Sequence, residues 1–315
     1  MTGGLVLLGW FATLWFAPVP APYHYELVKE GAPKDFPKLE LNDWPDLKLK
    51  QYNLQVEGAV KPIAQAIVAQ QGESSPVLID WQNNTRELIH NMGRKTSELS
   101  NIAAVIGKHA GSDALILSWW DTSRQLSLLT GRKTLFNSHM NEPLMIPLDW
   151  VEQGNGILSY EAQFWQSNTS QQEKDQFKQL GVALTAAPEQ GLAQLRELVG
   201  SERETYLVVH VTDLYKLGLI HPDKLGVAYQ NLPLTGNMHG MINQMKVQLE
   251  QNGFDTYTLQ SLSESEIRVF FLSDEQSSET LIAKLLPFTG KTAPLELDFI
   301  QLTYQYGSYW VYQLP

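Results

Sequence analysis

The stretch Ala114–Arg132 constrains the fold more than any other part of this sequence, because it joins a buried strand, a polar turn and the start of a helix. Its first residues, ALIL, form an apolar run of strand length, and Ser118-Trp119-Trp120-Asp121 follows directly. A helical pattern with three leucines then continues to Gly131, a residue type typical of helix ends. This order places Asp121 at the carboxyl end of a strand, where many α/β proteins bind their ligands.

A second unit of the same kind follows later in the chain. The apolar run Thr205–Val211 (TYLVVHV) ends in Thr212-Asp213 and leads into a short helical pattern with leucines. Strands that alternate with helices favour parallel pairing with right-handed crossovers. We therefore expect an α/β fold with a mixed, largely parallel sheet flanked by helices, and Asp121 and Asp213 on one edge of it. A ligand-binding edge would consist of Trp119, Trp120, Asp121 and Asp213.

Each of these residues also has a purely structural interpretation. Asp121 and Asp213 could cap the helices that they precede, and we favour this role over ligand contact. His210 lies in a run of Val and Leu, which is typical of a buried, hydrogen-bonded histidine. Trp119 and Trp120 are expected to pack into the core on opposite sides of the strand end, because successive strand side chains alternate.

Charge and cysteine content exclude several classes of protein. The 315 residues carry a net charge of −11 and have no run rich in Lys or Arg, which argues against nucleic-acid binding. The sequence contains no cysteine, which rules out disulfides, thiolate metal sites, cysteine nucleophiles and covalent c-type haem.

The sequence also lacks the patterns of common catalytic and metal sites. Its seven histidines are scattered, with no H-x-x-x-H pair, and there is no Asp-x-Asp metal loop. There is neither a G-x-S-x-G nucleophile elbow nor a glycine-rich phosphate loop after a strand. We therefore predict no catalytic residue, no metal site and no cofactor.

The N-terminal run Gly3–Ala17 (GGLVLLGWFATLWFA) is uncharged and almost wholly apolar. A spanning helix needs about 20 such residues, so we interpret residues 1–19 as a transmembrane anchor whose start could be incomplete. A cleaved signal peptide and a buried core helix are the alternatives. Residues 20–50, rich in proline, are predicted as an extended linker, and 51–315 as the α/β region, which could divide near 185–200.

Helices are predicted for Lys61–Gln71, where Pro62 suits a first turn, and for Ser97–Ala110, which ends at Gly111. Gln190–Val199 has a similar helical pattern. Alternating apolar residues at the end of the chain predict a closing hairpin around Gly307.

Long segments across the chain resemble the hydroxylamine oxidation protein HaoB family. They are ILSWWDTSRQLSLLTGR, TLFNSHMNEPL, YLVVHVTDLYKLGL, LTGNMHGMINQMKV, YTLQSLS and YQYGSYWVYQL. The resemblance implies a single membrane anchor and a domain on the periplasmic side of the bacterial inner membrane. It further implies a non-haem accessory subunit that binds hydroxylamine oxidoreductase, a trimeric multihaem cytochrome c. Three-fold symmetry would then place one copy on each enzyme subunit.

A second, local resemblance concerns Trp119-Trp120-Asp121, which is similar to the W-W-D-Y-G motif in the soluble domain of oligosaccharyltransferase catalytic subunits. In those enzymes the motif contacts the acceptor peptide, and this chain has Thr122-Ser123 in place of Tyr-Gly. The rival hypothesis is accordingly a glycan- or peptide-binding domain or a relict glycosyltransferase domain, and a small hydrolase is a third.

For the accessory subunit, two aromatic and proline-rich segments, 35–44 and 137–150, are the predicted partner contacts. Their candidate contact residues are Phe36, Trp44, Asn137, His139 and Trp150.

Overall fold

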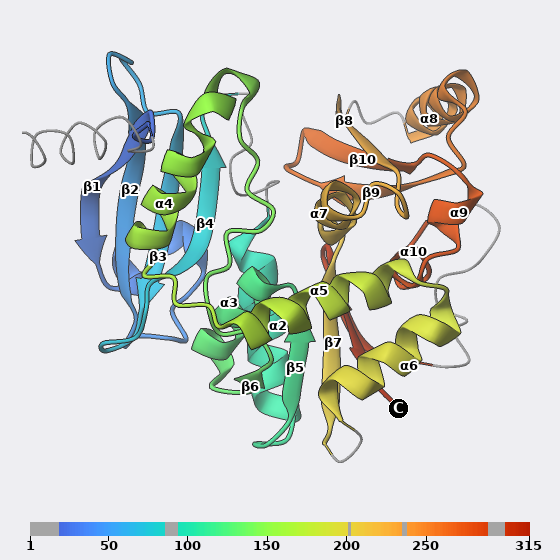
Figure 1. Ribbon diagram of the computed structural model, residues 1–315, viewed down its shortest axis with the longest axis horizontal. Coiled ribbons are helices and arrows are strands. Elements are labelled where there is room, and N and C mark those ends of the chain that lie inside the picture. The colour runs from blue at the N-terminus through green and yellow to red at the C-terminus, as the bar shows by residue number, and fades with distance from the viewer. Residues whose placement is uncertain (1–18, 86–93, 201–202, 235–237, 289–299) are drawn as a thin grey trace, which may run out of the picture.

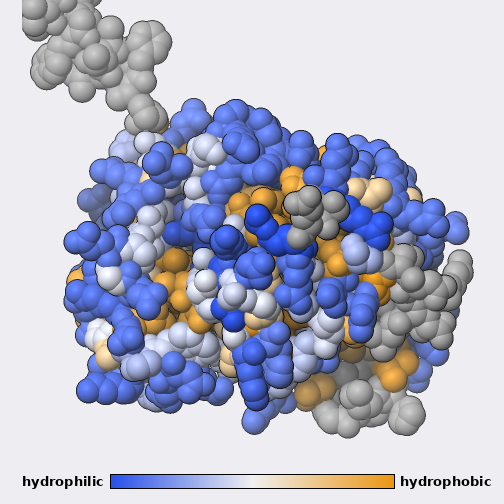
Figure 2. All heavy atoms as spheres, turned by 90° about the horizontal axis from the view of Figure 1, so that it is seen from below, coloured by the Kyte–Doolittle hydropathy of each residue, from blue (hydrophilic) through white to orange (hydrophobic). Residues whose placement is uncertain are grey.

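The computed structural model describes residues 19–85, 94–200, 203–234, 238–288 and 300–315 and has a mixed α/β architecture (Figure 1). Three sheets form its framework, with helices packed against them. The α/β class agrees with the prediction, but the largely parallel sheet does not, because most strand pairs are antiparallel. The face in Figure 2 is mostly hydrophilic, with hydrophobic residues visible between the polar ones, as is usual for globular proteins.

The first sheet is an antiparallel meander in which each strand pairs with the next one in sequence. Its strands are β1 (Tyr23–Gly31), β2 (Lys48–Val56), β3 (Ala64–Gln70) and β4 (Val77–Asn83). The helix predicted at Lys61–Gln71 is therefore wrong, because this segment is β3 between β2 and β4. The segment 20–50, predicted as an extended linker, contains β1 and two 3-10 turns, η1 (Pro33–Asp35) and η2 (Pro37–Leu39).

The central sheet has the order β11-β12-β7-β5-β6. Among the described strands, only the pairs β5–β7 and β5–β6 are parallel, and the C-terminal hairpin joins β7 in antiparallel fashion. A tight turn with Gly307 at φ 57° makes that hairpin possible, and an antiparallel connection needs no crossover helix. The strands are β5 (Leu115–Ser118), β6 (Lys133–Thr134), β7 (Thr205–His210), β11 (Gln301–Tyr306) and β12 (Tyr309–Gln313).

Alternating side chains of the central strands bury two different cores. Ile116 and Val208 belong to the core with α2 and α3, whereas Leu117 and Leu207 belong to the core with α5, α6 and α7. Both faces of the sheet are thus covered, as expected for strands with continuous apolar runs. The bounds are α2 (Thr96–His109), α3 (Trp120–Thr130), α5 (Gln171–Thr185), α6 (Pro188–Val199) and α7 (Asp213–Ile220).

The predicted helices at Ser97–Ala110 and Gln190–Val199 are confirmed as α2 and α6. The third sheet has the order β8-β10-β9, and its strands are β8 (Val227–Pro233), β9 (Thr256–Ser261) and β10 (Glu266–Leu272). The remaining helices are η3 (Leu148–Gln153), α4 (Gly154–Phe164), α8 (Met238–Asn252), α9 (Glu275–Ser278) and α10 (Leu281–Lys284).

The predicted membrane anchor, apart from Val19, lies outside the described residues. Among the residues that the structure describes, no helix combines the length and the apolar character needed to cross a membrane.

Candidate functional site

The two strand–turn–helix units meet at one edge of the central sheet. Strands β5 and β7 are parallel neighbours, with Ser118 opposite Val208, and each is followed directly by a helix. The parallel arrangement brings the first turns of α3 and α7 together, with Asp121 in one and Asp213 in the other.

Lys216 connects the two aspartates. Its Nζ lies 3.2 Å from Asp121 Oδ2 and 3.2 Å from Asp213 Oδ1. Arg94 binds Asp121 from the other side through both terminal nitrogens, with Nη1 3.1 Å from Oδ1, and Nη1 also donates to Thr122 Oγ1 at 2.7 Å. Two cations and two carboxylates thus form one cluster with no net formal charge.

The whole cluster is buried. Lys216 is 3% exposed and Arg94 8%, and Asp121 and Asp213 are buried as well. Charges removed from water are tolerated only when they are paired and hydrogen-bonded. The geometry meets this requirement, because each carboxylate receives at least one cation.

The environment shifts the pKa values of the cluster in opposite directions. Burial alone would raise the pKa of Asp121, but Arg94 and Lys216 together outweigh it and hold this pKa well below its usual range. Burial raises the pKa of Asp213, and the nearby Asp121 adds to the rise while Lys216 opposes it. Asp121 is therefore the more firmly ionised of the two aspartates.

His210 completes the inner part of the cluster. Its Nδ1 lies 2.7 Å from Thr212 Oγ1 and accepts from the main-chain N–H of Thr212 at 3.2 Å. Burial, together with the positive charges of Arg94 and Lys216, holds its pKa well below the ordinary value. The predicted buried, hydrogen-bonded histidine is confirmed.

The structure does not support the helix-capping role that we favoured for the aspartates. Trp119 is the N-cap of α3 and Thr212 that of α7, and neither helix has a side-chain cap. Asp121 is instead engaged by cations, and the Asp213 carboxylate accepts from the main-chain N–H of His210 at 2.9 Å, which ties the end of β7 to α7. Asp121 Oδ1 also accepts from the main-chain N–H of Thr122 at 2.6 Å, so this carboxylate binds a first-turn amide of α3 without being the N-cap.

Sequence reasoning missed Arg94 and Lys216. The only local signal for Lys216 is its position three residues after Asp213, which puts both on one side of a short helix. Arg94 gives no local signal, because it is 27 positions away from Asp121.

Trp119 and Trp120 are both buried in the core that contains α5 and α7. Trp119 packs edge-on against Phe177 with ring centroids 4.8 Å apart, and Lys216 Nζ lies 5.1 Å from its ring centre. The Trp120 ring is 4.5 Å from that of His139. The predicted burial in the core is confirmed, but the two indoles share one core instead of packing on opposite sides of the strand end. Trp119 borders the charge cluster through Lys216.

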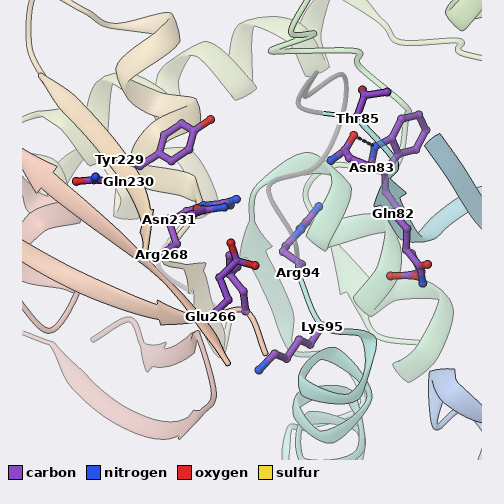
Figure 3. A pocket seen from close by; sticks show the side chains of 13 residues that line it. Gln82, Asn83, Thr85, Arg94, Lys95, Tyr229, Gln230, Asn231, Glu266 and Arg268 are labelled. Atoms are coloured by element: carbon purple, nitrogen blue, oxygen red, sulfur yellow. Dashed lines mark hydrogen bonds between the residues drawn. The ribbon is translucent and has the colours of Figure 1, made fainter. Parts of the chain in front are cut away.

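A cleft of 930 Å³ opens beside the cluster, between the first and third sheets (Figure 3). Arg94 and Lys95 lie between residues of β4 on one side and of β8 and β10 on the other. Its lining combines charged, amide and aromatic side chains: Asp80, Trp81, Gln82, Asn83, Thr85, Arg94, Lys95, Tyr229, Gln230, Asn231, Leu262, Glu266 and Arg268. Arg94 thus belongs to both the buried cluster and the cleft.

The predicted partner contacts have different exposures. Phe36 is 6% and His139 2% exposed, so these side chains are not accessible to another protein. Trp44 and Trp150 are half-buried; Trp44 donates through Nε1 to the Leu129 carbonyl. Asn137 is the exposed member of the five. The packing of proline-rich loops against the sheets explains the buried members.

In the described part of the chain, no group of three or more His, Asp or Glu side chains is arranged to hold a metal ion. The charge cluster contains two aspartates, but both are already bound by cations.

Comparison with known proteins gives one family match. The model of the family described as HaoA-associated protein HaoB matches residues 1–314. No curated protein shows significant similarity to the chain.

Two solved structures are similar to parts of the chain. The C-terminal domain of PglB from C. jejuni is 8% identical, with a TM-score of 0.38, and the match covers 69% of this chain and 99% of that domain. The C-terminal globular domain of oligosaccharyltransferase from Archaeoglobus fulgidus is 10% identical, with a TM-score of 0.33, covering 70% and 99%.

Proposed function

The chain belongs to the family of the HaoA-associated protein HaoB, and we propose that it is a non-haem accessory subunit that binds HaoA directly and thereby supports hydroxylamine oxidation. HaoA is hydroxylamine oxidoreductase, and the accessory role to this enzyme follows from family membership. The observation that carries the proposal is the extent of the family match, from residue 1 to residue 314.

A role without haem is supported by the sequence. Covalent attachment of c-type haem needs the cysteines of a C-x-x-C-H motif, and this sequence has none. A partner of a multihaem enzyme with this composition would act by binding or positioning the enzyme, with the electron-carrying groups on HaoA.

A non-catalytic role is supported by the charge cluster. Asp121 is bound by both Arg94 and Lys216, and the pKa of Asp121 is held low, so this carboxylate is a poor proton acceptor near neutral pH. The pKa of His210 is held low by burial, and its Nδ1 is already bound to Thr212. The groups best suited to acid–base chemistry are thus used to hold β5, β7, α3 and α7 together.

We further propose that the chain is tethered on the periplasmic side of the inner membrane through the apolar run Gly3–Ala17. One copy would then bind each subunit of HaoA, since a symmetric enzyme offers the same surface on every subunit. An accessory protein of this kind would keep a periplasmic enzyme close to the membrane.

The test is co-purification from native membranes. The full chain with a C-terminal affinity tag is solubilised in mild detergent, captured and analysed by mass spectrometry and by the haem absorption spectrum. Recovery of HaoA in equal molar amount, and of the chain in the membrane fraction, is the expected result. Recovery of the chain without any haem protein, together with thermal stabilisation by added sugars, would replace this proposal with the glycan-binding alternative.

A further inference from the structure

We propose that the edge of β8 inside the cleft binds an extended segment of a partner protein, which adds a fourth strand to the sheet β8-β10-β9. HaoA is the partner, so the inference rests on the proposed function and names the surface that carries it out.

The residues that line the cleft show that it faces the edges of β4 and β8. Three consecutive residues of β8, from Tyr229 to Asn231, and four of β4, from Asp80 to Asn83, border the same space. Successive side chains of a strand point to opposite faces of its sheet. A space bordered by consecutive residues therefore lies in the plane of the strand and faces its main chain.

The ladder between β8 and β10 identifies which main-chain groups of β8 face the cleft. Leu234 N donates to Ser265 O at 2.8 Å, and Gly226 O accepts from Ser273 N at 3.0 Å. Main-chain groups of a strand alternate in direction, and the register between these two bonds is continuous. Even-numbered residues of β8 thus bond to β10, and the N–H and C=O groups of Tyr229 and Asn231 point away from it.

Nothing in the described part of the chain pairs with this side of β8, which is an edge strand in its sheet. Pro233 fits the same assignment. It has an odd number, so its missing N–H falls on the outer side, where proline costs no ladder bond. Tyr229 and Asn231 therefore present two donors and two acceptors about 7 Å apart, which is the two-residue repeat of another strand.

The opposite edge, on β4, is partly occupied. Arg124 Nη2 donates to Pro76 O at 2.8 Å, and Gln125 Nε2 donates to Leu78 O at 2.7 Å. The main-chain N–H of Trp81 donates to the Asp80 carboxylate. Side chains of α3 and Asp80 thus take up three main-chain groups at and beside this strand, whereas no described residue pairs with the outward main-chain groups of Tyr229 and Asn231.

Lys95 gives an incoming segment one accessible cation. Arg94 is already bound to Asp121, and the other two cations of the lining, Lys95 and Arg268, are matched in number by Asp80 and Glu266. Lys95, with a side chain 33% exposed, is the cation that a Glu or Asp on the incoming strand would reach.

The test compares Asn231→Pro with Asn231→Ala in the full chain. Both variants lose the bond from Arg268 Nε to Asn231 Oδ1, but only the proline removes the outward N–H. We expect Asn231→Ala to keep its affinity for HaoA within about threefold and Asn231→Pro to bind HaoA about tenfold or more weakly. A tenfold loss of affinity corresponds to about 1.4 kcal/mol, which is close to the net value of one hydrogen bond. Equal affinities of the two variants would overturn the inference while leaving the proposed function intact.

A second measurement covers the case in which the proline variant does not fold. Wild-type chain and HaoA are coupled with a carbodiimide, which joins an amine and a carboxylate in contact, and the products are mapped by mass spectrometry. A cross-link from Lys95 to Asp or Glu of HaoA is expected, together with slower amide exchange in 227–233. Binding of HaoA without either change would overturn the inference, and absence of binding would overturn the proposed function as well.

Discussion

Lys216 and Asp121, 95 positions apart in the chain, form a buried ion pair in which Nζ lies 3.2 Å from Oδ2. The pair joins α7 to α3 at the carboxyl ends of β7 and β5. Because Arg94 binds the same carboxylate and Asp213 the same ammonium group, four buried charges depend on one another. Four predictions follow from this and from other buried contacts.

Replacing Lys216 by Met should lower the free energy of unfolding by about 3–5 kcal/mol, because Asp213 loses its cationic partner while it stays buried. Urea denaturation followed by circular dichroism measures the change. Lys224→Met, at an exposed position close by, is the control and should change stability by no more than about 0.5 kcal/mol. Similar losses in both variants would show that the ion pair adds nothing specific.

Stability should depend on pH through His210. Its pKa in the folded protein lies well below the ordinary value, so below about pH 6.5 the unfolded chain binds a proton that the folded chain does not. Stability therefore falls as the pH decreases from 6.5, by up to about 1.4 kcal/mol per pH unit. Urea titrations of wild type and His210→Gln between pH 7.5 and 5 should give a smaller pH slope for the variant. Parallel curves would contradict the assignment.

Two helical glycines should respond to alanine in opposite ways. A Cβ at Gly191 in α6 would lie 2.3 Å from the Ala183 carbonyl oxygen, so Gly191→Ala should destabilise the protein by about 1–3 kcal/mol. A Cβ at Gly107 in α2 would contact nothing within 4 Å, so Gly107→Ala should stabilise it by about 0.5–1 kcal/mol. Thermal unfolding of the two variants tests the close contact of α5 and α6, and two shifts of the same sign would argue against it.

Glu161 should be intolerant of even a near-isosteric change. This side chain is fully buried, and its carboxylate accepts from Tyr23 Oη, Tyr25 Oη and Trp165 Nε1. Glu161→Gln puts an N–H₂ group where donors already point, which should cost about 1–3 kcal/mol. The exposed Glu152 provides the matched control, since Glu152→Gln changes the same atoms in water. Chemical denaturation of both variants should show a loss for Glu161 alone.

The prediction of the fold succeeded where a segment's own pattern decides its structure. The helices α2 and α6 and the strands β5 and β7 bury faces that are visible in their sequences. The prediction failed at β3, whose alanine-rich sequence after Pro62 has a helical character but forms the strand between β2 and β4. It also failed for the direction of most strand pairs, because neighbours in a sheet are chosen by the whole core.

The candidate site likewise has features set by local sequence and features set by tertiary packing. The sequence alone determined that Asp121 and Asp213 follow buried strands at the start of helices, because this depends on residues only a few positions away. Only the tertiary structure decided their partners, since Arg94 and Lys216 reach Asp121 across 27 and 95 positions. The position of β8 at the edge of its sheet was likewise set by sheet order, which no local pattern encodes. Burial supplies the physical reason: once packing removes water from the edge, each carboxylate must be matched by whichever cation the fold brings within reach.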